Sequence, residues 1–156
     1  MRRPTGPLAL PASASRARAE GGGGVELVCV DPKRVHEIWP HVAELIHGAV
    51  KRTNLSHTLD IDDDILHGHG LLWLACRDSK ILAAMTTSLV STDRDKVCIL
   101  TACGGEQMSQ WLPLLRQIEA YARDEGCSCI RIYGRRGWAR VLESYHTEHI
   151  ILERRL

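Results

Sequence analysis

The sequence predicts a mixed α/β (α+β) domain in which helices cover both faces of a mostly antiparallel central sheet. Two segments, 35–49 and 111–122, carry apolar residues three and four positions apart, which indicates amphipathic helices. Short runs of apolar and β-branched residues, bounded by turn residues, precede and follow these segments and indicate strands. Read along the chain, the predicted order is β-α-α-β-β-β-α-β-α-β.

The composition is that of an ordinary globular domain, with 44% hydrophobic and 25% charged residues in a chain of 156. The formal net charge is +1, of which residues 1–24 contribute +3 and the rest of the chain −2. A nearly neutral domain gives no electrostatic basis for binding nucleic acid. No apolar run approaches the roughly 20 residues that a membrane helix needs. We therefore expect a cytoplasmic protein with neither a nucleic acid nor a membrane as partner.

Residues 1–24 are rich in Arg, Ala, Ser and Pro and end in four glycines. A segment with so little apolar content cannot bury enough surface to order itself, so we expect a disordered tail followed by one domain over 25–156. Two alternatives remain open. The segment could be an organellar targeting sequence, since it is basic and poor in acids. Alternatively, the natural protein could begin downstream of it.

The domain is expected to open with a strand at 25–30. Asp31 and Pro32 then suit the N-cap and first position of a helix. Pro40 lies within the apolar pattern of that helix and predicts a kink or two abutting helices. Residues 60–67 follow as a short helix whose acidic first turn is favourable to the helix dipole.

Histidines and cysteines are numerous, but their spacing does not indicate a metal site. His67 and His69 lie in one turn and would need two further ligands that the sequence does not place. Cys127 and Cys129 likewise lack the geometry of a metal pair. The six cysteines are spread through predicted strands, as expected of buried thiols in a reducing compartment. We expect no bound metal.

The second half of the chain contains a strand, a glycine pair and a helix in succession. Gly104 and Gly105 are expected to form the turn between strand and helix, and Gly126 to end the helix. Two strands joined through a helix lie parallel, with a right-handed crossover. The remaining predicted elements are a three-strand meander (71–77, 81–91, 96–103), a strand at 127–133, a helix at 138–144 and a last strand at 149–153.

This order, with glycines after the fourth predicted strand, resembles the GNAT family of acyl-CoA-dependent N-acyltransferases over residues 25–156. The run Ile132–Leu142 resembles the fifth strand and following helix of GNAT-like proteins carried by phages and prophages. The resemblance implies a transferase that moves an acetyl group from acetyl-CoA to an amine of a small molecule or protein. Its co-substrate would lie where the fourth and fifth strands splay apart. The alternative is a non-catalytic GNAT-fold protein of phage origin, acting in virion assembly or host interaction, with a phage or host protein as partner and a virion-associated location.

The resemblance also implies site residues, although the family's pyrophosphate-binding motif, Gln/Arg-x-x-Gly-x-Gly/Ala, fits in neither register. Placing Gly104 on its first glycine puts Thr101 and Glu106 at the flanking motif positions. A glutamate there would repel a pyrophosphate. The implied co-substrate contacts are Ala102, Cys103, Gly104, Gly105, Gln107, Arg135 and Arg136.

The catalytic positions also depart from the family pattern. Glu143 occupies the place of the family's tyrosine. Tyr145 follows two residues later, about 200° further around a helix, and would serve only if the helix has already ended. Glu143 and Tyr145 are the implied catalytic residues, and both the acyltransferase and the non-catalytic interpretation remain open.

Overall fold

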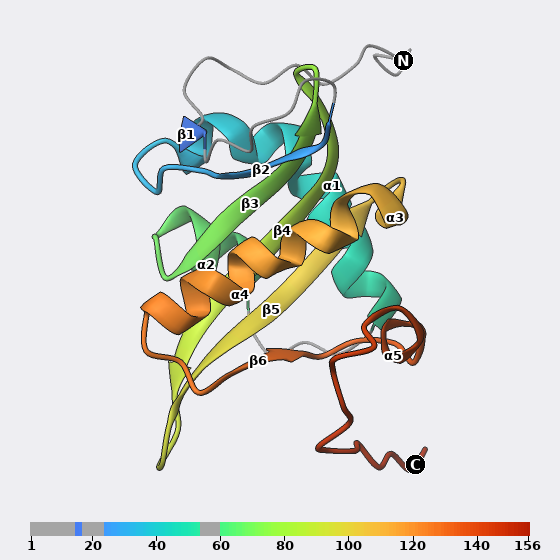
Figure 1. Ribbon diagram of the computed structural model, residues 1–156. Coiled ribbons are helices and arrows are strands. Elements are labelled where there is room, and N and C mark those ends of the chain that lie inside the picture. Colours follow the sequence, from blue (N-terminus) through green and yellow to red (C-terminus); the bar gives the residue numbers. More distant parts are fainter. Residues whose placement is uncertain (1–14, 17–23, 54–59) are drawn as a thin grey trace.

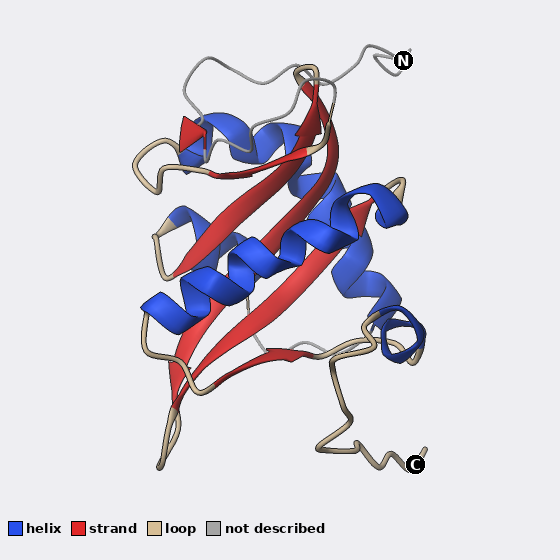
Figure 2. Cartoon of the chain, viewed as in Figure 1, coloured by secondary structure: helices blue, strands red, loops and turns tan. Residues whose placement is uncertain are grey.

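The computed structural model describes residues 15–16, 24–53 and 60–156, which form one sheet covered by helices on both faces (Figures 1 and 2). The sheet has the order β1-β2-β3-β4-β5-β6. The predicted fold class is confirmed. The strands are β1 (Ser15–Arg16), β2 (Glu26–Cys29), β3 (Gly70–Arg77), β4 (Lys80–Ser91), β5 (Lys96–Gly105) and β6 (Cys129–Ile132). The helices are α1 (Val35–Thr53), α2 (Ile61–Leu66), α3 (Met108–Trp111), the 3-10 turn η1 (Leu112–Leu114), α4 (Leu115–Asp124) and α5 (Gly137–Val141).

Strands β1 to β5 pair antiparallel, whereas β5 and β6 pair parallel, as the intervening helical segment requires. Helices α1 and α2 pack on one face of the sheet, around Ile38, Val42 and Ile46. Helix α4 packs on the other face, where Leu115 and Ile118 contact residues of the central strands. The predicted meander and parallel crossover are both confirmed.

Pro40 does not divide the first helix, so the predicted pair of abutting helices is wrong. Helix α1 runs through Pro40 for 19 residues. It also begins at Val35 rather than at Pro32: residues 32–34 form a turn, in which the side chain of Asp31 accepts from the amide of Lys33 at 2.9 Å. Its apolar face is almost fully buried against the sheet. Tertiary packing of an amphipathic face generally outweighs local propensity in this way.

The two glycines after the fourth predicted strand do not form a turn, which corrects the sequence-based interpretation. Gly104 and Gly105 are the last residues of β5 and pair with Ala84 and Ala83 of β4. A Cβ on Gly104 would lie 2.9 Å from the carbonyl carbon of Leu45, so helix α1 crosses the strand there in direct backbone contact. The glycines therefore permit close packing.

The chain turns from strand to helix at Glu106 and Gln107, one step later than predicted. Gln107 adopts a left-handed backbone conformation (φ 54°) and precedes α3. The single helix predicted over 111–122 is instead divided into α3, η1 and α4. Pro113 lies within η1, where a proline is tolerated because the first amides of a helix have no internal partner.

The secondary structure at the two ends of the chain differs from the prediction. Ser15 and Arg16 pair with β2, while the rest of residues 1–23 lies outside the described residues. At the other end, the strand predicted over 149–153 is not formed, and residues 145–156 contain neither helix nor strand. Among the described helices, none combines the length and apolar character needed to cross a membrane.

Candidate functional site

The strands β5 and β6 separate part-way along their length. Their pairing begins at Val97–Cys129 and stops at Leu100–Ile132, whereas β5 continues to Gly105. Beyond Leu100, β5 remains paired only with β4 among the described strands. Its other edge therefore faces a gap and leaves backbone N–H and C=O groups without a strand partner.

A β-bulge lies where the gap opens. Thr86 of β4 pairs with Ala102 and Thr87 pairs with Leu100, so Thr101 is an extra residue in β5. The hydroxyl groups of Thr86 and Thr101 are hydrogen-bonded at 2.6 Å, which holds the bulge in place. Because of the extra residue, Leu100 packs on the α4 side of the sheet and Ala102 on the α1 side.

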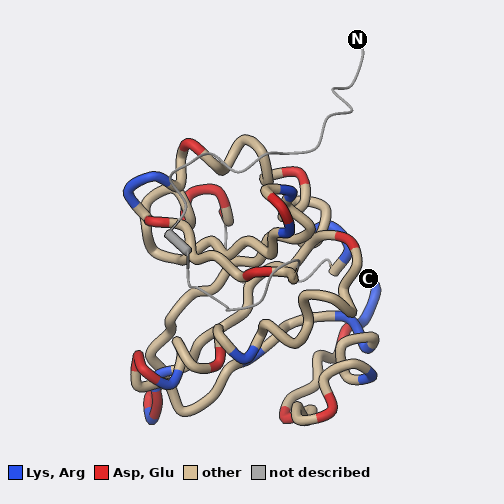
Figure 3. Tube along the Cα trace, turned by 45° about the horizontal axis from the view of Figure 1, so that its top comes forward, with Lys and Arg blue, Asp and Glu red and all other residues tan. Residues whose placement is uncertain are grey.

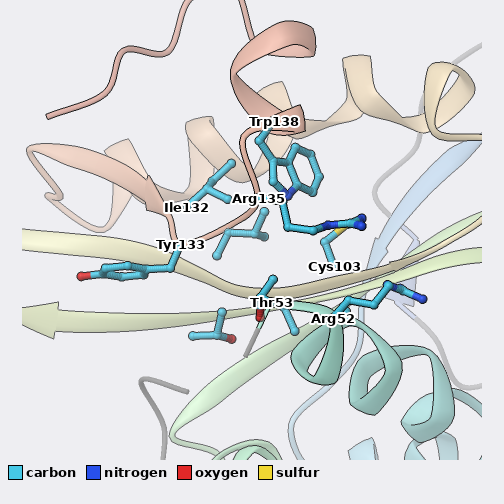
Figure 4. Close-up of a pocket in the computed structure, with 11 residues that line it drawn as sticks. Arg52, Thr53, Cys103, Ile132, Tyr133, Arg135 and Trp138 are labelled. Carbon is cyan, nitrogen blue, oxygen red and sulfur yellow. The ribbon is translucent and has the colours of Figure 1, made fainter. Parts of the chain in front are cut away.

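A cavity of about 50 Å³ occupies the gap. A void of this size holds at most a few water molecules, so a larger ligand could enter only if side chains moved. Its walls come from the end of α1, from β5 and from the segment that follows β6 (Figure 4). The lining residues are Ala49, Arg52, Thr53, Leu100, Thr101, Ala102, Cys103, Ile132, Tyr133, Arg135 and Trp138.

Two arginines give the cavity a positive mouth. Arg52 from α1 and Arg135 from the segment after β6 extend in the same direction from opposite walls, and the ring of Tyr133 extends the other way (Figure 4). Within the described parts of the chain, neither guanidinium forms an ion pair or a side-chain hydrogen bond. Acidic and basic positions are both spread over the described chain (Figure 3). An anion would therefore find two available charged donors here.

Cys103 lies between the two arginines (Figure 4). Burial raises the pKa of its thiol to about 12, although the positive charge of Arg52 acts in the opposite direction. The thiol is thus protonated at neutral pH. Since the thiolate is the nucleophilic form, Cys103 is suited to packing against a ligand rather than to attacking one.

The structure brings together only part of the set of residues implied by the sequence. Ala102, Cys103 and Arg135 line the cavity. Arg136 immediately precedes α5 and is exposed, and Gln107 is exposed before α3. The implied residues outside the cavity lining are Gly104, Gly105, Gln107, Arg136, Glu143 and Tyr145.

The implied catalytic residues lie beyond the end of α5. Glu143 is exposed in the turn that follows the helix. The hydroxyl of Tyr145 donates a hydrogen bond to Glu119 Oε1 on α4 at 2.9 Å. Burial, followed by this hydrogen bond and the charge of Glu119, raises the pKa of Tyr145 well above its usual range, so it stays protonated.

Eight of the eleven lining residues were missed by the sequence interpretation. These residues come together only through contacts between segments that are distant in the sequence. Helix α1 also extends beyond residue 49, where the predicted helix ended, and so includes Arg52. Trp138 lies over Gly134, where a Cβ would come within 2.8 Å of the indole nitrogen. Gly134 was the one feature in the sequence that could have indicated the position of Trp138, because the absence of a side chain at Gly134 leaves space for the indole ring. The missed residues are Ala49, Arg52, Thr53, Leu100, Thr101, Ile132, Tyr133 and Trp138.

Comparison with solved structures decides the fold. Neither a family model nor a curated protein matches the sequence. A predicted acetyltransferase with acetyl-CoA from Clostridium acetobutylicum is 13% identical, with a TM-score of 0.58, covering 85% of this chain and 95% of its own. A GNAT family acetyltransferase from Staphylococcus aureus is 9% identical, with a TM-score of 0.56, covering 85% and 99%. The fold is the GNAT fold.

A third structure shares the GNAT fold and contains an amine ligand. It is an aminoglycoside acetyltransferase from an uncultured soil metagenomic sample in complex with sisomicin, 9% identical, with a TM-score of 0.57 and coverage of 85% and 96%. At such low identities the likeness establishes the fold alone, because one fold can carry many functions. In the family's own count, β5 and β6 correspond to the fourth and fifth strands of the GNAT fold.

Proposed function

We propose that this protein is a GNAT-type N-acyltransferase that moves an acetyl group from acetyl-CoA to an amine. The observation that carries the proposal is the separation of β5 from β6 beside the bulge at Thr101, with two arginines at its mouth. The amine could belong to a small molecule or to a protein. No feature of the described residues favours the non-catalytic phage alternative, and none of the three compared structures is described as a phage protein.

The free edge of β5 suits the extended arm of acetyl-CoA. Beyond Leu100 this edge presents backbone donors and acceptors to the gap. An extended chain that contains amide groups can pair with such an edge much as an added strand would. Ala102 and Cys103 would contact the arm with their side chains. The cavity would have to widen, since its volume of about 50 Å³ is far smaller than the arm.

The phosphates would be bound mainly by arginine rather than by backbone amides. Arg52 and Arg135 can form charge-assisted hydrogen bonds to phosphate oxygens. The amide of Glu106 is already used, because it donates to the carbonyl of Leu82 at 2.9 Å. The exposed carboxylate of Glu106 would repel the ligand. We therefore expect weak binding, with a dissociation constant on the order of 0.1 mM.

In the transfer step the amine attacks the thioester carbonyl and loses a proton, while the departing thiolate of coenzyme A gains one. Tyr145 is the proposed proton donor, since its phenol stays protonated at any working pH. Its hydroxyl would first have to leave Glu119 and move to the cavity, since Tyr145 does not line it. Glu143, being exposed, could accept the proton of the amine only through water.

Calorimetry with acetyl-CoA tests the proposed binding site. Arg135→Gln should weaken binding by about 10- to 100-fold, because a hydrogen bond to a charged group contributes roughly 1.5–3 kcal/mol. Arg140→Gln is the matched control, since Arg140 is also exposed near α5 but does not line the cavity. The proposal fails if folded wild-type protein gives no heat with millimolar acetyl-CoA, or if both variants bind equally well.

Turnover of a Tyr145→Phe variant tests the proton donor. Loss of a general acid should lower kcat by about 100-fold or more and leave the dissociation constant of acetyl-CoA unchanged. Tyr133→Phe is the comparison, because Tyr133 lines the cavity. A larger loss of kcat in Tyr133→Phe than in Tyr145→Phe would move the role to Tyr133.

A further inference from the structure

Two threonine hydroxyls meet at the point where β5 separates from β6. Thr86 Oγ1 on β4 and Thr101 Oγ1 on β5 are 2.6 Å apart, and in such a pair either hydroxyl can donate. Met85, the neighbour of Thr86, packs in the cluster under α4, so Thr86 faces the opposite side of the sheet, toward α1. Thr101 reaches the same side and lines the cavity together with Ala49 of α1. The hydroxyl pair therefore lies between the core and the cavity.

The difference in burial between the two threonines indicates which hydroxyl donates. Thr86 is fully buried, and its hydroxyl has no other hydrogen bond in the described structure. If Thr101 donated to Thr86, the proton of Thr86 would be buried without an acceptor, which is costly. If Thr86 donates instead, its proton is satisfied and Thr101 keeps its own proton. Thr101 is only partly buried and lines the cavity, so its proton can be donated to a ligand there.

A second threonine lines the same cavity, but its hydroxyl is already used. Thr53 Oγ1 donates to the carbonyl oxygen of Val50 within the last turn of α1 at 3.0 Å. Of the two threonine hydroxyls in the cavity wall, that of Thr101 is therefore the one with a proton available to a ligand. The bond from Thr86 also fixes the direction in which this proton points, because it occupies an acceptor position of the Thr101 oxygen.

The place of Thr101 along the gap corresponds to the reacting end of acetyl-CoA. The two arginines at the mouth, where the phosphates would bind, lie on either side of Cys103 (Figure 4). The gap closes at its other end, where Leu100 pairs with Ile132. Thr101 is the first residue of β5 beyond that pair. An extended arm that enters between the arginines and follows the free edge of β5 therefore brings its thioester to Thr101.

We propose that the hydroxyl of Thr101 donates a hydrogen bond to the carbonyl oxygen of the acetyl thioester, and that Thr86 positions this hydroxyl. The role rests on the proposed acetyl transfer. As the amine nitrogen bonds to the carbonyl carbon, the electron pair of the C=O double bond moves onto oxygen, and it moves back when the C–S bond breaks and the thiolate leaves. The hydroxyl loses no proton in this step. Its hydrogen bond is strongest while the oxygen carries negative charge, and a donor oriented beforehand therefore lowers the barrier.

Infrared spectroscopy of bound acetyl-CoA tests the contact. An isotope label at the thioester carbonyl separates its band from those of the protein, and a hydrogen bond lowers the frequency of that band because it weakens the C=O bond. The band should lie at lower frequency in the wild type than in Thr101→Val. The kcat of Thr101→Val should fall about 100-fold, as on loss of one donor to a developing oxyanion. Binding of free coenzyme A, which lacks the thioester carbonyl, should not change. Thr101→Ser keeps a hydroxyl and should restore both the band and kcat.

Thr87→Val is the matched control for a purely structural effect. Thr87 is also a buried threonine of β4, but its hydroxyl accepts from Trp73 Nε1 at 3.0 Å on the other face of the sheet. This variant should lower the urea midpoint and leave the carbonyl band and kcat unchanged. Thr86→Val should raise the carbonyl frequency and lower kcat less than Thr101→Val does, and Thr86→Ser should restore both. Equal effects of Thr87→Val and Thr86→Val on the band would remove the positioning role of Thr86.

The direction of the hydrogen bond can be measured without any ligand. In NMR spectra the hydroxyl proton of Thr86 should exchange slowly with water, because it is buried and bonded, whereas that of Thr101 should exchange fast. The reverse order would mean that Thr101 donates to Thr86, and would overturn the proposal. A wild type that binds acetyl-CoA with the same carbonyl frequency as Thr101→Val overturns this role alone. A wild type that does not bind acetyl-CoA overturns the proposed function, and this role with it.

Discussion

Raising the pH from 9 to 11 should unfold the protein, because its buried thiols cannot ionise where they lie. Desolvation by burial is the main cause of the raised pKa in each case. The nearby charge of Asp31 adds to the effect at Cys29, and that of Glu26 adds to it at Cys76. The affected thiols are Cys29, with a pKa of about 11, and Cys76, Cys98 and Cys103, each with a pKa of about 12.

The direction of the effect follows from comparing the two states. In the unfolded chain these thiols release their protons near pH 9, whereas in the folded chain they keep them. Stability is therefore complete below pH 9 and falls as the pH rises toward the folded pKa values. Above pH 9 each thiol lowers the free energy of unfolding by at most about 1.4 kcal/mol per pH unit, so four lower it by up to about 6 kcal/mol per pH unit. A small domain has only about 5–15 kcal/mol in total.

Urea unfolding at pH 8, 9 and 10 measures this dependence. The midpoint should fall slightly from pH 8 to 9, where the thiols of the unfolded chain are half ionised, and more steeply from pH 9 to 10. Cys98→Ala should reduce the loss between pH 9 and 10 by about a quarter, because Cys98 is fully buried. Cys129→Ala is the matched control and should leave the loss unchanged, since Cys129 is exposed. Equal midpoints at pH 8 and 10 would contradict the prediction.

The predictable part of this fold is the part encoded locally. The meander and the amphipathic pattern of α1 follow from the spacing of apolar residues. The short helix predicted over 60–67 is observed as α2, where Asp60 Oδ1 accepts from the amide of Asp62 at 2.9 Å. Pro40 misled the interpretation, because the local penalty of a proline was outweighed by burial of the face on both sides of it.

The candidate site is not encoded locally, and therefore only part of it could be predicted from the sequence. The gap depends on where β5 stops pairing with β6, and on an extra residue at Thr101 that shifts the register with β4. Neither feature has a period that can be read along the chain. Arg52 and Trp138 line the same cavity although they are more than eighty residues apart in the sequence. The strand predicted over 149–153 is not formed, although its isoleucines and leucine favour strands.

Replacing Gly104 by alanine should destabilise the protein by about 3 kcal/mol or more. A Cβ at this position would lie 2.9 Å from the carbonyl carbon of Leu45 and closer still to its oxygen. These are backbone atoms of α1, so no side-chain rotation can relieve the contact. Either α1 moves off β5 or the strand bends, and both changes disrupt the core beneath the helix.

Urea unfolding compares Gly104→Ala with Gly137→Ala, in which the new methyl group meets nothing within 4 Å. Gly137→Ala lies at the start of α5 and should be neutral or slightly stabilising, because alanine favours helix. The comparison bears on function, since α1 carries Ala49 and Arg52 into the wall of the gap. A loss of acetyl-CoA binding in Gly104→Ala would thus indicate that α1, which forms one wall of the cavity, has moved. A loss of binding in Arg135→Gln would instead indicate the loss of a contact with phosphate. If Gly104→Ala is as stable as Gly137→Ala, α1 does not lie directly on β5, and Arg52 cannot be part of the site.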